Sequence, residues 1–283
     1  MHGLGNDFVV LDARGAEDPT SPALVRALSD RRRGVGCDQV IVLRDTTDRA
    51  AAADIDFWNA DGSMSGACGN GTRCAADLAM TGAAAGRVTL RGANGPLVCE
   101  RTPDGQVRVD MGAPKLDWRD IPLRDAHHTE RIDVKLGPID DPALWGPGAV
   151  NMGNPHCVFF VEDAENAPAD TLGPMIENHP MFPERTNVEF AQVLDKGRVR
   201  ARVWERGTGV TQACGSGACA VAVAAARRLL TGREVEVILD GGALFIEWRA
   251  EDDHVLMTGP AATVFAGVLT PEFLAGVDAG AGA

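Results

Sequence analysis

Two cysteines stand in matching sequence contexts, and this pairing is the strongest indication of chemistry in the chain. Residues 58–71 have the sequence WNADGSMSGACGNG, and residues 204–217 have the sequence WERGTGVTQACGSG. The two segments keep one offset, since 204 − 58 and 214 − 68 are both 146. A register kept over this length indicates two homologous halves, in which Cys68 corresponds to Cys214. We therefore expect each half to supply one thiol to a shared site.

Two such thiols can exchange the hydrogen on one substrate carbon. Both cysteines directly precede a Gly-x-Gly turn and a predicted helix. A cysteine at a helix N-terminus has a lowered pKa, so we expect its thiolate to be accessible near neutral pH. One thiolate can remove a proton from one face of a carbon while the other thiol delivers a proton to the opposite face, which inverts the configuration. Because this chemistry needs no electron sink, we expect no metal and no organic cofactor.

The glycine-rich turns at 69–71 and 215–217 are candidates for anion binding. They lead into helices whose first backbone N–H groups are unpaired and whose dipole favours negative charge. A substrate carboxylate fits there, and the charge of a carbanion would spread onto it. One such turn alone is also explained as a tight turn before a helix, but two copies beside two cysteines favour anion binding. Residues 215–220 match a dinucleotide fingerprint in letters, yet the preceding residues 208–212 are polar, unlike the buried strand of that fold.

Amide and charged side chains in turns or at strand ends could contact the substrate. Asparagine is common in turns for structural reasons, so each amide alone is a weak signal. Glu205 and Arg206 occupy the place of Asn59 and Ala60 in the first half, and an arginine there suits bidentate binding of a carboxylate. His156 could support a thiol, or it could be a local hydrogen-bonding residue. The amides are Asn6, Gln39, Asn59, Asn70, Asn154 and Asn187.

The other cysteines and the lysines indicate no further chemistry. None of the seven cysteines forms a Cys-x-x-Cys pair, which argues against structural zinc, and we expect the other five to be buried free thiols. Pyridoxal phosphate needs a lysine anchor, and the three lysines lie outside any motif. The five cysteines are Cys37, Cys74, Cys99, Cys157 and Cys219, and the lysines are Lys115, Lys135 and Lys196.

The composition is that of an ordinary globular protein. Hydrophobic residues make up 45% of the 283 residues and charged residues 24%, and the net charge is −13. An acidic chain without a basic patch argues against nucleic acid and anionic membranes as partners. The first residues do not resemble a secretory leader, and the longest apolar run, 218–226, is shorter than the ~20 residues of a membrane span. We therefore expect a cytoplasmic protein that acts on a small molecule.

Apolar periodicity and turn signals predict an α+β fold. Each half has mostly antiparallel strands and about one long helix, which predicts a sheet or barrel around a central helix. We expect two homologous pseudo-symmetric lobes with the active site in the cleft between them, one formed by 1–113 and completed by 260–283, the other by 114–259. The predicted strands are 8–11, 40–43, 55–58, 88–90, 97–100, 107–111, 158–161, 187–193, 198–204, 235–239, 244–248 and 255–257, and the predicted helices are 21–32, 72–80, 169–178 and 218–230.

Three finer expectations concern local structure. The dipeptides Asn94-Gly95 and Asp104-Gly105 predict hairpin turns between strands. The segment 112–136, rich in Pro, Asp and His, is expected to cross between the halves. The tail 276–283 is expected to be frayed.

Six short motifs carry a resemblance to one known family. They are HGLGNDF at 2–8, NADGS at 59–63, ACGNG-x-RC at 67–74, MGNPH at 152–156, ERG at 205–207 and QACGSGAC at 212–219. With these motifs the chain resembles the diaminopimelate epimerases over nearly its whole length. The resemblance implies a cofactor-independent, two-cysteine isomerase that interconverts LL- and meso-diaminopimelate in the synthesis of lysine and peptidoglycan precursors.

The resemblance also implies roles for single residues. Cys68 and Cys214 would be the acid/base pair, with His156 and Glu205 as catalytic helpers. The family is typically dimeric through a tyrosine where this chain has Phe265, and the chain has no tyrosine, so a homodimer here would form without that hydroxyl. The implied substrate contacts are Asn6, Gln39, Asn59, Gly69, Asn70, Asn154, Asn187, Glu205, Arg206, Gly215 and Ser216.

Two other functions remain open from the residues alone. The same two-thiol chemistry could act on another amino acid, as in a proline-type or histidine-type racemase, because chemistry at the α-carbon says nothing about the side chain. A non-catalytic anion- or nucleotide-binding protein could use the two glycine-rich turns. Such a binding protein would have no need for paired cysteines at symmetric positions.

Overall fold

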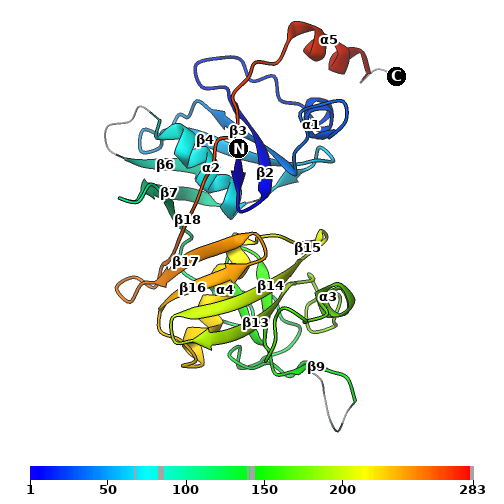
Figure 1. The fold of residues 1–283 in the computed structure, drawn as a ribbon, viewed down its shortest axis with the longest axis vertical. Coiled ribbons are helices and arrows are strands. Elements are labelled where there is room, and N and C mark those ends of the chain that lie inside the picture. The colour runs from blue at the N-terminus through cyan, green and yellow to red at the C-terminus, as the bar shows by residue number, and fades with distance from the viewer. Residues whose placement is uncertain (67, 82–85, 139, 141–143, 281–283) are drawn as a thin grey trace. The chain divides into compact units, whose positions relative to one another are not determined.

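The chain forms two compact units (Figure 1). The computed structural model describes all residues except 67, 82–85, 139, 141–143 and 281–283. Unit 1 comprises Met1–Val109 and Gly259–Ala283, and unit 2 comprises Asp110–Thr258. The C-terminal segment joins unit 1 through His2, whose backbone N–H and carbonyl both bond to Ala262, each at 2.9 Å.

Unit 1 is built on one mixed sheet in the order β1-β2-β3-β4-β6-β7-β8, with β5 added to β4. The pairs β2/β3 and β4/β6 are parallel and the others are antiparallel. The strands are β1 His2–Gly3, β2 Asn6–Asp12, β3 Gln39–Arg44, β4 Ala53–Asn59, β5 Met64–Ser65, β6 Arg87–Gly92, β7 Gly95–Arg101 and β8 Val107–Asp110, and the helices are α1 Pro22–Ser29, α2 Gly69–Ala79 and α5 Pro271–Gly280.

Unit 2 repeats this topology strand for strand, in the order β11-β12-β13-β14-β16-β17-β18 with β15 added to β14. Its parallel pairs are β12/β13 and β14/β16, and β9 pairs with β10 in a separate ribbon. The strands are β9 Lys135–Leu136, β10 Leu144–Trp145, β11 Gly148–Asn151, β12 Pro155–Phe160, β13 Asn187–Asp195, β14 Arg198–Glu205, β15 Gly209–Thr211, β16 Glu234–Leu239, β17 Gly242–Trp248 and β18 Val255–Gly259, and the helices are α3 Ala169–Glu177 and α4 Gly215–Arg227.

The parallel pairs explain where the helices lie in the chain order. A parallel pair needs a crossover, and each pair has one helix between its strands: α1 and α2 in unit 1, α3 and α4 in unit 2. The sequence of α4, GSGACAVAVAAAR, is small or apolar on all sides, and ten of its residues are buried. The α+β fold with two pseudo-symmetric lobes is thereby confirmed.

The structure corrects several element boundaries. The helices α2 and α4 begin at Gly69 and Gly215, three residues earlier than the apolar pattern predicts, because each glycine-rich turn is itself the first helical turn. The hairpin between β6 and β7 turns at residues 93 and 94, and Gly95 already belongs to β7 with φ 118°. Among the described residues, no helix is long and apolar enough to span a bilayer.

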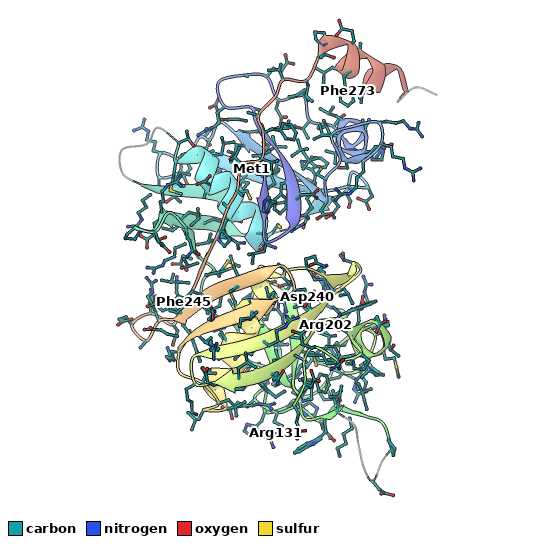
Figure 2. All side chains as sticks on the ribbon, in the orientation of Figure 1. Met1, Arg131, Arg202, Asp240, Phe245 and Phe273 are labelled. Carbon is teal, nitrogen blue, oxygen red and sulfur yellow. The ribbon has the colours of Figure 1, made fainter. Side chains whose placement is uncertain are left out.

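The C-terminal tail is not frayed over the part that the structure describes. Residues 276–280 belong to α5, and 281–283 lie outside the described residues. Three side chains of α5, Phe273, Leu274 and Val277, pack on the apolar cluster beneath α1, and Phe273 is labelled in Figure 2. The apolar burial of this face explains why the segment is ordered despite its position at the chain end.

Candidate active site

Cys68 caps the N-terminus of α2. Its backbone is extended (φ −149°, ψ 107°), and its Sγ accepts a hydrogen bond from the backbone N–H of Gly71 at 3.4 Å. The N–H and the hydroxyl of Thr72 both donate to the carbonyl oxygen of Cys68, at 2.8 and 2.9 Å. A Cβ on Gly71 would lie 2.8 Å from Cδ1 of Ile41, so this first helical turn lies directly on β3. The predicted position of Cys68 at a helix N-terminus is confirmed.

Two of the predicted substrate contacts lie beside Cys68. The thiol donates to Oδ1 of Asn6 at 3.9 Å, and Nδ2 of Asn70 donates to the same oxygen at 3.4 Å. Nδ2 of Asn6 donates to Oδ2 of Asp38 at 2.8 Å. The fold thus brings the start of β2 to the first turn of α2 and fixes the orientation of the Asn6 amide.

Gln39 and Asn59 are cross-strand neighbours at the ends of β3 and β4. Nε2 of Gln39 donates to Oδ1 of Asn59 at 3.0 Å, and Nδ2 of Asn59 donates to the hydroxyl oxygen of Ser63 at 3.1 Å. Because β2 and β3 are parallel and β4 is antiparallel to β3, these two amides lie at the same sheet edge as Asn6. Unit 1 therefore gathers its predicted contacts at one edge.

Arg73 is a further residue of this site that the sequence patterns do not single out. It is fully buried; its Nη2 donates to Oδ1 of Asn70 at 3.0 Å and its Nε donates to the carbonyl of Pro260 at 3.2 Å. A guanidinium is buried only where polar partners meet it. In the sequence, Arg73 stands out only as a long cationic side chain within a helix of mostly small residues. The sequence could not show which groups it would bond to.

Cys214 occupies the N-cap position of α4, as Cys68 does in α2, but it is more deeply buried than Cys68. Its backbone is extended (φ −120°, ψ 113°), and its Sγ lies 3.5 Å from the hydroxyl oxygen of Ser216. Cys214 is 5% exposed, whereas Cys68 is half-buried. A Cβ on Gly217 would lie 3.4 Å from the Cys214 sulfur and 3.0 Å from Oε1 of Glu189. The Cys214 thiol and the buried carboxylate of Glu189 therefore both border the position that a side chain on residue 217 would occupy.

Burial raises the pKa of the Cys214 thiol well above its usual value. The negative charges of Glu205 and Glu189 act in the same direction, while the hydroxyl of Ser216 and the N–H of Gly217 oppose the shift. The expected lowering of the pKa by the helix N-terminus is therefore wrong for Cys214, because desolvation outweighs the helix end. With its pKa raised in this way, Cys214 is a thiol and not a thiolate, and a thiol can donate a proton.

Glu205 ends β14, at the position that Asn59 holds in unit 1. Its Oε1 accepts a hydrogen bond from the hydroxyl of Thr211 on β15 at 2.6 Å. The charge of Glu205 raises the pKa of Cys214, which means that the two groups are close enough to interact. The β14–β15 hairpin thus holds a carboxylate near the second thiol.

His156 and Glu189 form a buried pair on the adjacent strands β12 and β13. Nδ1 of His156 lies 2.6 Å from Oε1 of Glu189, and Nε2 lies 2.9 Å from Oδ1 of Asn154. Both side chains of the pair are 0% exposed. Burial raises the pKa of Glu189, and the charge of His156 opposes that shift. The sequence patterns do not single out Glu189, although a carboxylate in the middle of the apolar strand Asn187–Asp195 was a signal that could have found it.

Asn187 and Arg206 meet at the start of β13. Nδ2 of Asn187 donates to the carbonyl of Pro155 at 2.9 Å, and its Oδ1 accepts from the backbone N–H of Arg206 at 2.9 Å. The Arg206 guanidinium donates through Nη1 to the carbonyl of Glu184 at 2.9 Å. The buried carboxylate of Glu177, another residue missed in the sequence, accepts from the N–H of Gly207 at 3.0 Å and thereby fixes the same loop.

A pocket of about 340 Å³ opens beside these residues in unit 2. Two predicted substrate contacts, Asn154 and Arg206, line it. Its wall carries charges of both signs, and the full lining is Arg119, Asp120, Pro122, Asn151, Gly153, Asn154, Pro155, Glu184 and Arg206. Such a pocket suits a small polar ligand that bears both a carboxylate and an ammonium group.

The other cysteines and the lysines are not among the candidate substrate contacts described above. The remaining five cysteines are buried, as expected, and none of them is in a disulfide. In the part of the chain that the structure describes, no three His, Cys, Asp or Glu side chains are grouped as metal ligands would be. Of the lysines, Lys196 donates to the carbonyl of Leu229 and Lys135 pairs with Asp133, both at exposed positions.

The two-unit α+β topology and the paired cysteines at helix N-termini place the chain in a class of folds that includes amino-acid epimerases. A solved hydroxyproline epimerase from Agrobacterium vitis, with bound trans-4-hydroxy-L-proline, has a TM-score of 0.64 to this chain. That comparison covers 93% of this chain and 89% of the other at 16% sequence identity, so it concerns the fold alone.

The family itself follows from the sequence comparisons. The family model described as diaminopimelate epimerase matches residues 1–116 and 148–264, and the chain belongs to this family. The diaminopimelate epimerase of Rhodospirillum centenum is 54% identical over 276 residues, which cover 98% of this chain and 93% of that protein. The diaminopimelate epimerase of Phenylobacterium zucineum is 54% identical over 271 residues, which cover 95% and 96%.

Proposed function

We propose that this protein is a diaminopimelate epimerase, which interconverts LL- and meso-diaminopimelate in the synthesis of lysine and peptidoglycan precursors. The observation that carries the proposal is the matched pair of cysteines, each capping the helix that follows the same strand in its unit, within a chain of this family. The reaction must reach both faces of one α-carbon, and two thiols at equivalent positions of the two units provide one group for each face.

The protonation of Cys214 sets the order of proton transfers. In the cycle that starts with Cys214 as a thiol, Cys68 acts as thiolate and removes the α-proton. Cys214 then delivers its own proton to the opposite face of the carbanion, so that the carbon regains four bonds with inverted configuration. The two thiols end the cycle with exchanged protonation, and the reverse direction starts from that state.

The substrate carboxylate carries the charge that develops at the α-carbon. The first backbone N–H groups of a helix can donate to an anion and the helix dipole adds to them, so the N-termini of α2 and α4 are our candidates for holding this carboxylate. Asn6 and Asn70 lie beside Cys68, and Ser216 lies beside Cys214, where each can hold the carboxylate or the α-ammonium. Glu205 and His156 are the helpers that we assign to the second thiol, on the strength of their positions in unit 2.

The far end of the substrate distinguishes diaminopimelate from proline-type substrates. Diaminopimelate carries a second ammonium and a second carboxylate, whereas a proline ring offers no charge there. The pocket lined by Arg206 and Asn154 has cationic and anionic groups for such an end, and an arginine suits a carboxylate. A proline-type substrate would leave these charges without a partner.

A homodimer is a further part of the proposal. Three side chains between β18 and α5, Val264, Phe265 and Val268, are exposed by 67%, 66% and 93%. Exposed apolar side chains in one short segment are typical of a protein contact. Sedimentation of the purified protein and of Phe265→Ser tests this, since the substitution should shift the protein toward monomer.

The function is tested by incubating the protein with single amino acids in deuterated water. LL- and meso-diaminopimelate should each gain one α-deuterium with inversion, whereas L-proline, trans-4-hydroxy-L-proline and L-histidine should not. Deuterium in proline but not in diaminopimelate would replace the substrate assignment, and no exchange with any amino acid would favour a non-catalytic binding protein.

A further inference from the structure

The two units are equivalent in backbone but differ in the side chains under their active cysteines. Trp58 and Trp204 are equivalent, and they pair with Val40 and Val188, so Ile41 corresponds to Glu189. A Cβ on the first-turn glycine of the helix would lie 2.8 Å from Cδ1 of Ile41 in unit 1 and 3.0 Å from Oε1 of Glu189 in unit 2. Cys68 thus has an alkyl group below its helix turn, and Cys214 has a carboxylate.

The neighbouring strand shows the same contrast. Phe8 of β2 pairs with Gln39, and His156 of β12 pairs with the equivalent residue Asn187, so Phe8 corresponds to His156. Unit 1 therefore has a phenyl ring and an alkyl group where unit 2 has an imidazole and a carboxylate 2.6 Å apart. The same backbone would accept an apolar pair at this place, as unit 1 demonstrates.

A buried acid of this kind is costly to keep without a function. Both side chains of the pair are fully buried, and Oε2 of Glu189 has no hydrogen-bond partner among the described residues. An unsatisfied buried carboxylate oxygen costs free energy that an isoleucine in the same place would not. The asymmetry therefore points to a role in chemistry rather than in stability.

Three elements contribute charged or polar groups around the Cys214 thiol. Glu189 on β13 and Glu205 on β14 oppose its ionisation, while Ser216 and the N–H of Gly217 on α4 favour it. Glu189 in turn faces His156 and the buried thiol of Cys157, both on β12. Burial is the largest cause of the raised pKa of Cys214, the charge of Glu205 is the next, and the charge of Glu189 adds to them. Glu189 is the charged group whose counterpart in unit 1 is a hydrocarbon, so its contribution has no equivalent at Cys68.

We propose that Glu189 is a positioning residue that makes the two thiols inequivalent. It orients the imidazole of His156 through Nδ1 and places a negative charge across Gly217 from the Cys214 sulfur, and so it favours the protonated form of Cys214 in the free enzyme. The consequence for turnover rests on the proposed epimerase function: Glu189 biases the free enzyme toward the state from which one direction of epimerisation starts, and the other direction starts from the less populated state. The effect on the thiol itself does not depend on any substrate.

The experiment measures the alkylation of each cysteine in the full chain against pH. The protein without substrate is treated with iodoacetamide, and the pH midpoint of alkylation is read separately for the peptides of Cys68 and Cys214 by mass spectrometry. In Glu189→Gln the amide keeps an acceptor for His156 but loses the charge. We expect the Cys214 midpoint to fall by about one pH unit, the size of a nearby charge effect, while the Cys68 midpoint stays in place.

Two matched variants separate charge from packing. Glu189→Asp keeps the charge and should leave the Cys214 midpoint close to that of the wild type, whereas Ile41→Val changes the equivalent position in unit 1 and should shift neither midpoint. If Glu189→Gln does not fold, Glu189→Leu removes the same charge with a side chain like that of Ile41.

The outcomes decide between the proposal and its alternatives. The role of Glu189 would be overturned by any of three results. The Cys214 midpoint could stay unmoved in Glu189→Gln, it could shift equally in Glu189→Gln and Glu189→Asp, or the Cys68 midpoint could shift in parallel with it. In the active enzyme, the limb of the pH profile of kcat/KM that belongs to Cys214 should move in the same direction as its alkylation midpoint. If the wild-type protein shows the two alkylation midpoints but no α-deuterium exchange, the proposed epimerase function is refuted and the role of Glu189 is not.

Discussion

The indole of Trp204 packs directly against the backbone of Gly173 in α3. A Cβ on residue 173 would lie 2.4 Å from Cγ and 2.5 Å from Cδ2 of that ring, closer than any side chain can approach. The indole is also held by its Nε1–H, which donates to Glu177 at 2.7 Å. Trp204 is the last residue before Glu205 and Arg206, so the contact between α3 and β14 helps to position two candidate site residues.

Gly173→Ala should therefore both destabilise unit 2 and lower its activity. The added methyl must displace the indole or the helix, and overpacking of this kind costs about 1–3 kcal/mol. Urea unfolding and kcat/KM measure the two effects. The matched control is Gly276→Ala in α5, where the Cβ meets nothing within 4 Å; it should be neutral or stabilising by up to about 1 kcal/mol. Equal stabilities of the two variants would contradict the packing argument.

Cys68→Ala and Cys214→Ala should each abolish epimerisation of diaminopimelate. Removing a group that transfers a proton in the transition state costs about 10²–10⁴ in rate, and no neighbouring thiol can replace it. Circular dichroism should show that both variants remain folded. Cys219→Ala removes a fully buried thiol of α4 and serves as the control, because it should lose packing but retain turnover. Full activity of either active-site variant would remove that thiol from the mechanism.

Arg206→Ala should weaken the binding of the distal end of the substrate. A charged hydrogen bond is worth about 1.5–3 kcal/mol, so kcat/KM for diaminopimelate should fall by roughly 10- to 100-fold. Arg119→Ala is the control in the same pocket. The Arg119 side chain is 70% exposed, and its guanidinium stacks on Trp118 at 4.6 Å, so its loss should cost less than about threefold. A larger effect for Arg119 than for Arg206 would mean that the distal end lies elsewhere in the pocket.

The stability of the protein should fall at alkaline pH because several thiols are buried. Burial raises the pKa of Cys74 to about 11 and raises the pKa of Cys157 well above its usual value. A thiol with a raised pKa stays protonated in the folded chain while the unfolded chain loses its proton. Its stabilising contribution is thus complete below pH 9, the usual thiol pKa, and is lost as the pH rises toward 11.

Urea unfolding in reductant from pH 7.5 to 11 measures this loss. Two pKa units for Cys74 correspond to at most about 3 kcal/mol. Cys74→Ala should lower the stability at pH 7.5 by its packing loss but should flatten the slope between pH 9 and 11. An unchanged slope would show that Cys74 does not ionise on unfolding in this range.

The amino-acid sequence by itself determined the duplication, the helix that follows each of the two matched cysteines and most of the strands. These features depend on local patterns, such as alternating apolar residues or a cysteine before Gly-x-Gly, and local patterns are visible along the chain. The local patterns nevertheless placed the starts of two helices too late, after the glycine residues at which they begin. The glycine-rich turns that begin α2 and α4 are helical because packing on the sheet overrides the low helix propensity of glycine.

Only the tertiary structure decided the electrostatic environment of the thiols. Cys214 occupies the same place in its motif as Cys68, and its pKa is raised first by burial and then by the charges of Glu205 on β14 and Glu189 on β13. Arg73 and Glu177 likewise acquire their partners from residues far along the chain. Burial and charge depend on what packs against a side chain, and that is set by contacts between distant segments, so the two equal motifs could not reveal that their thiols differ.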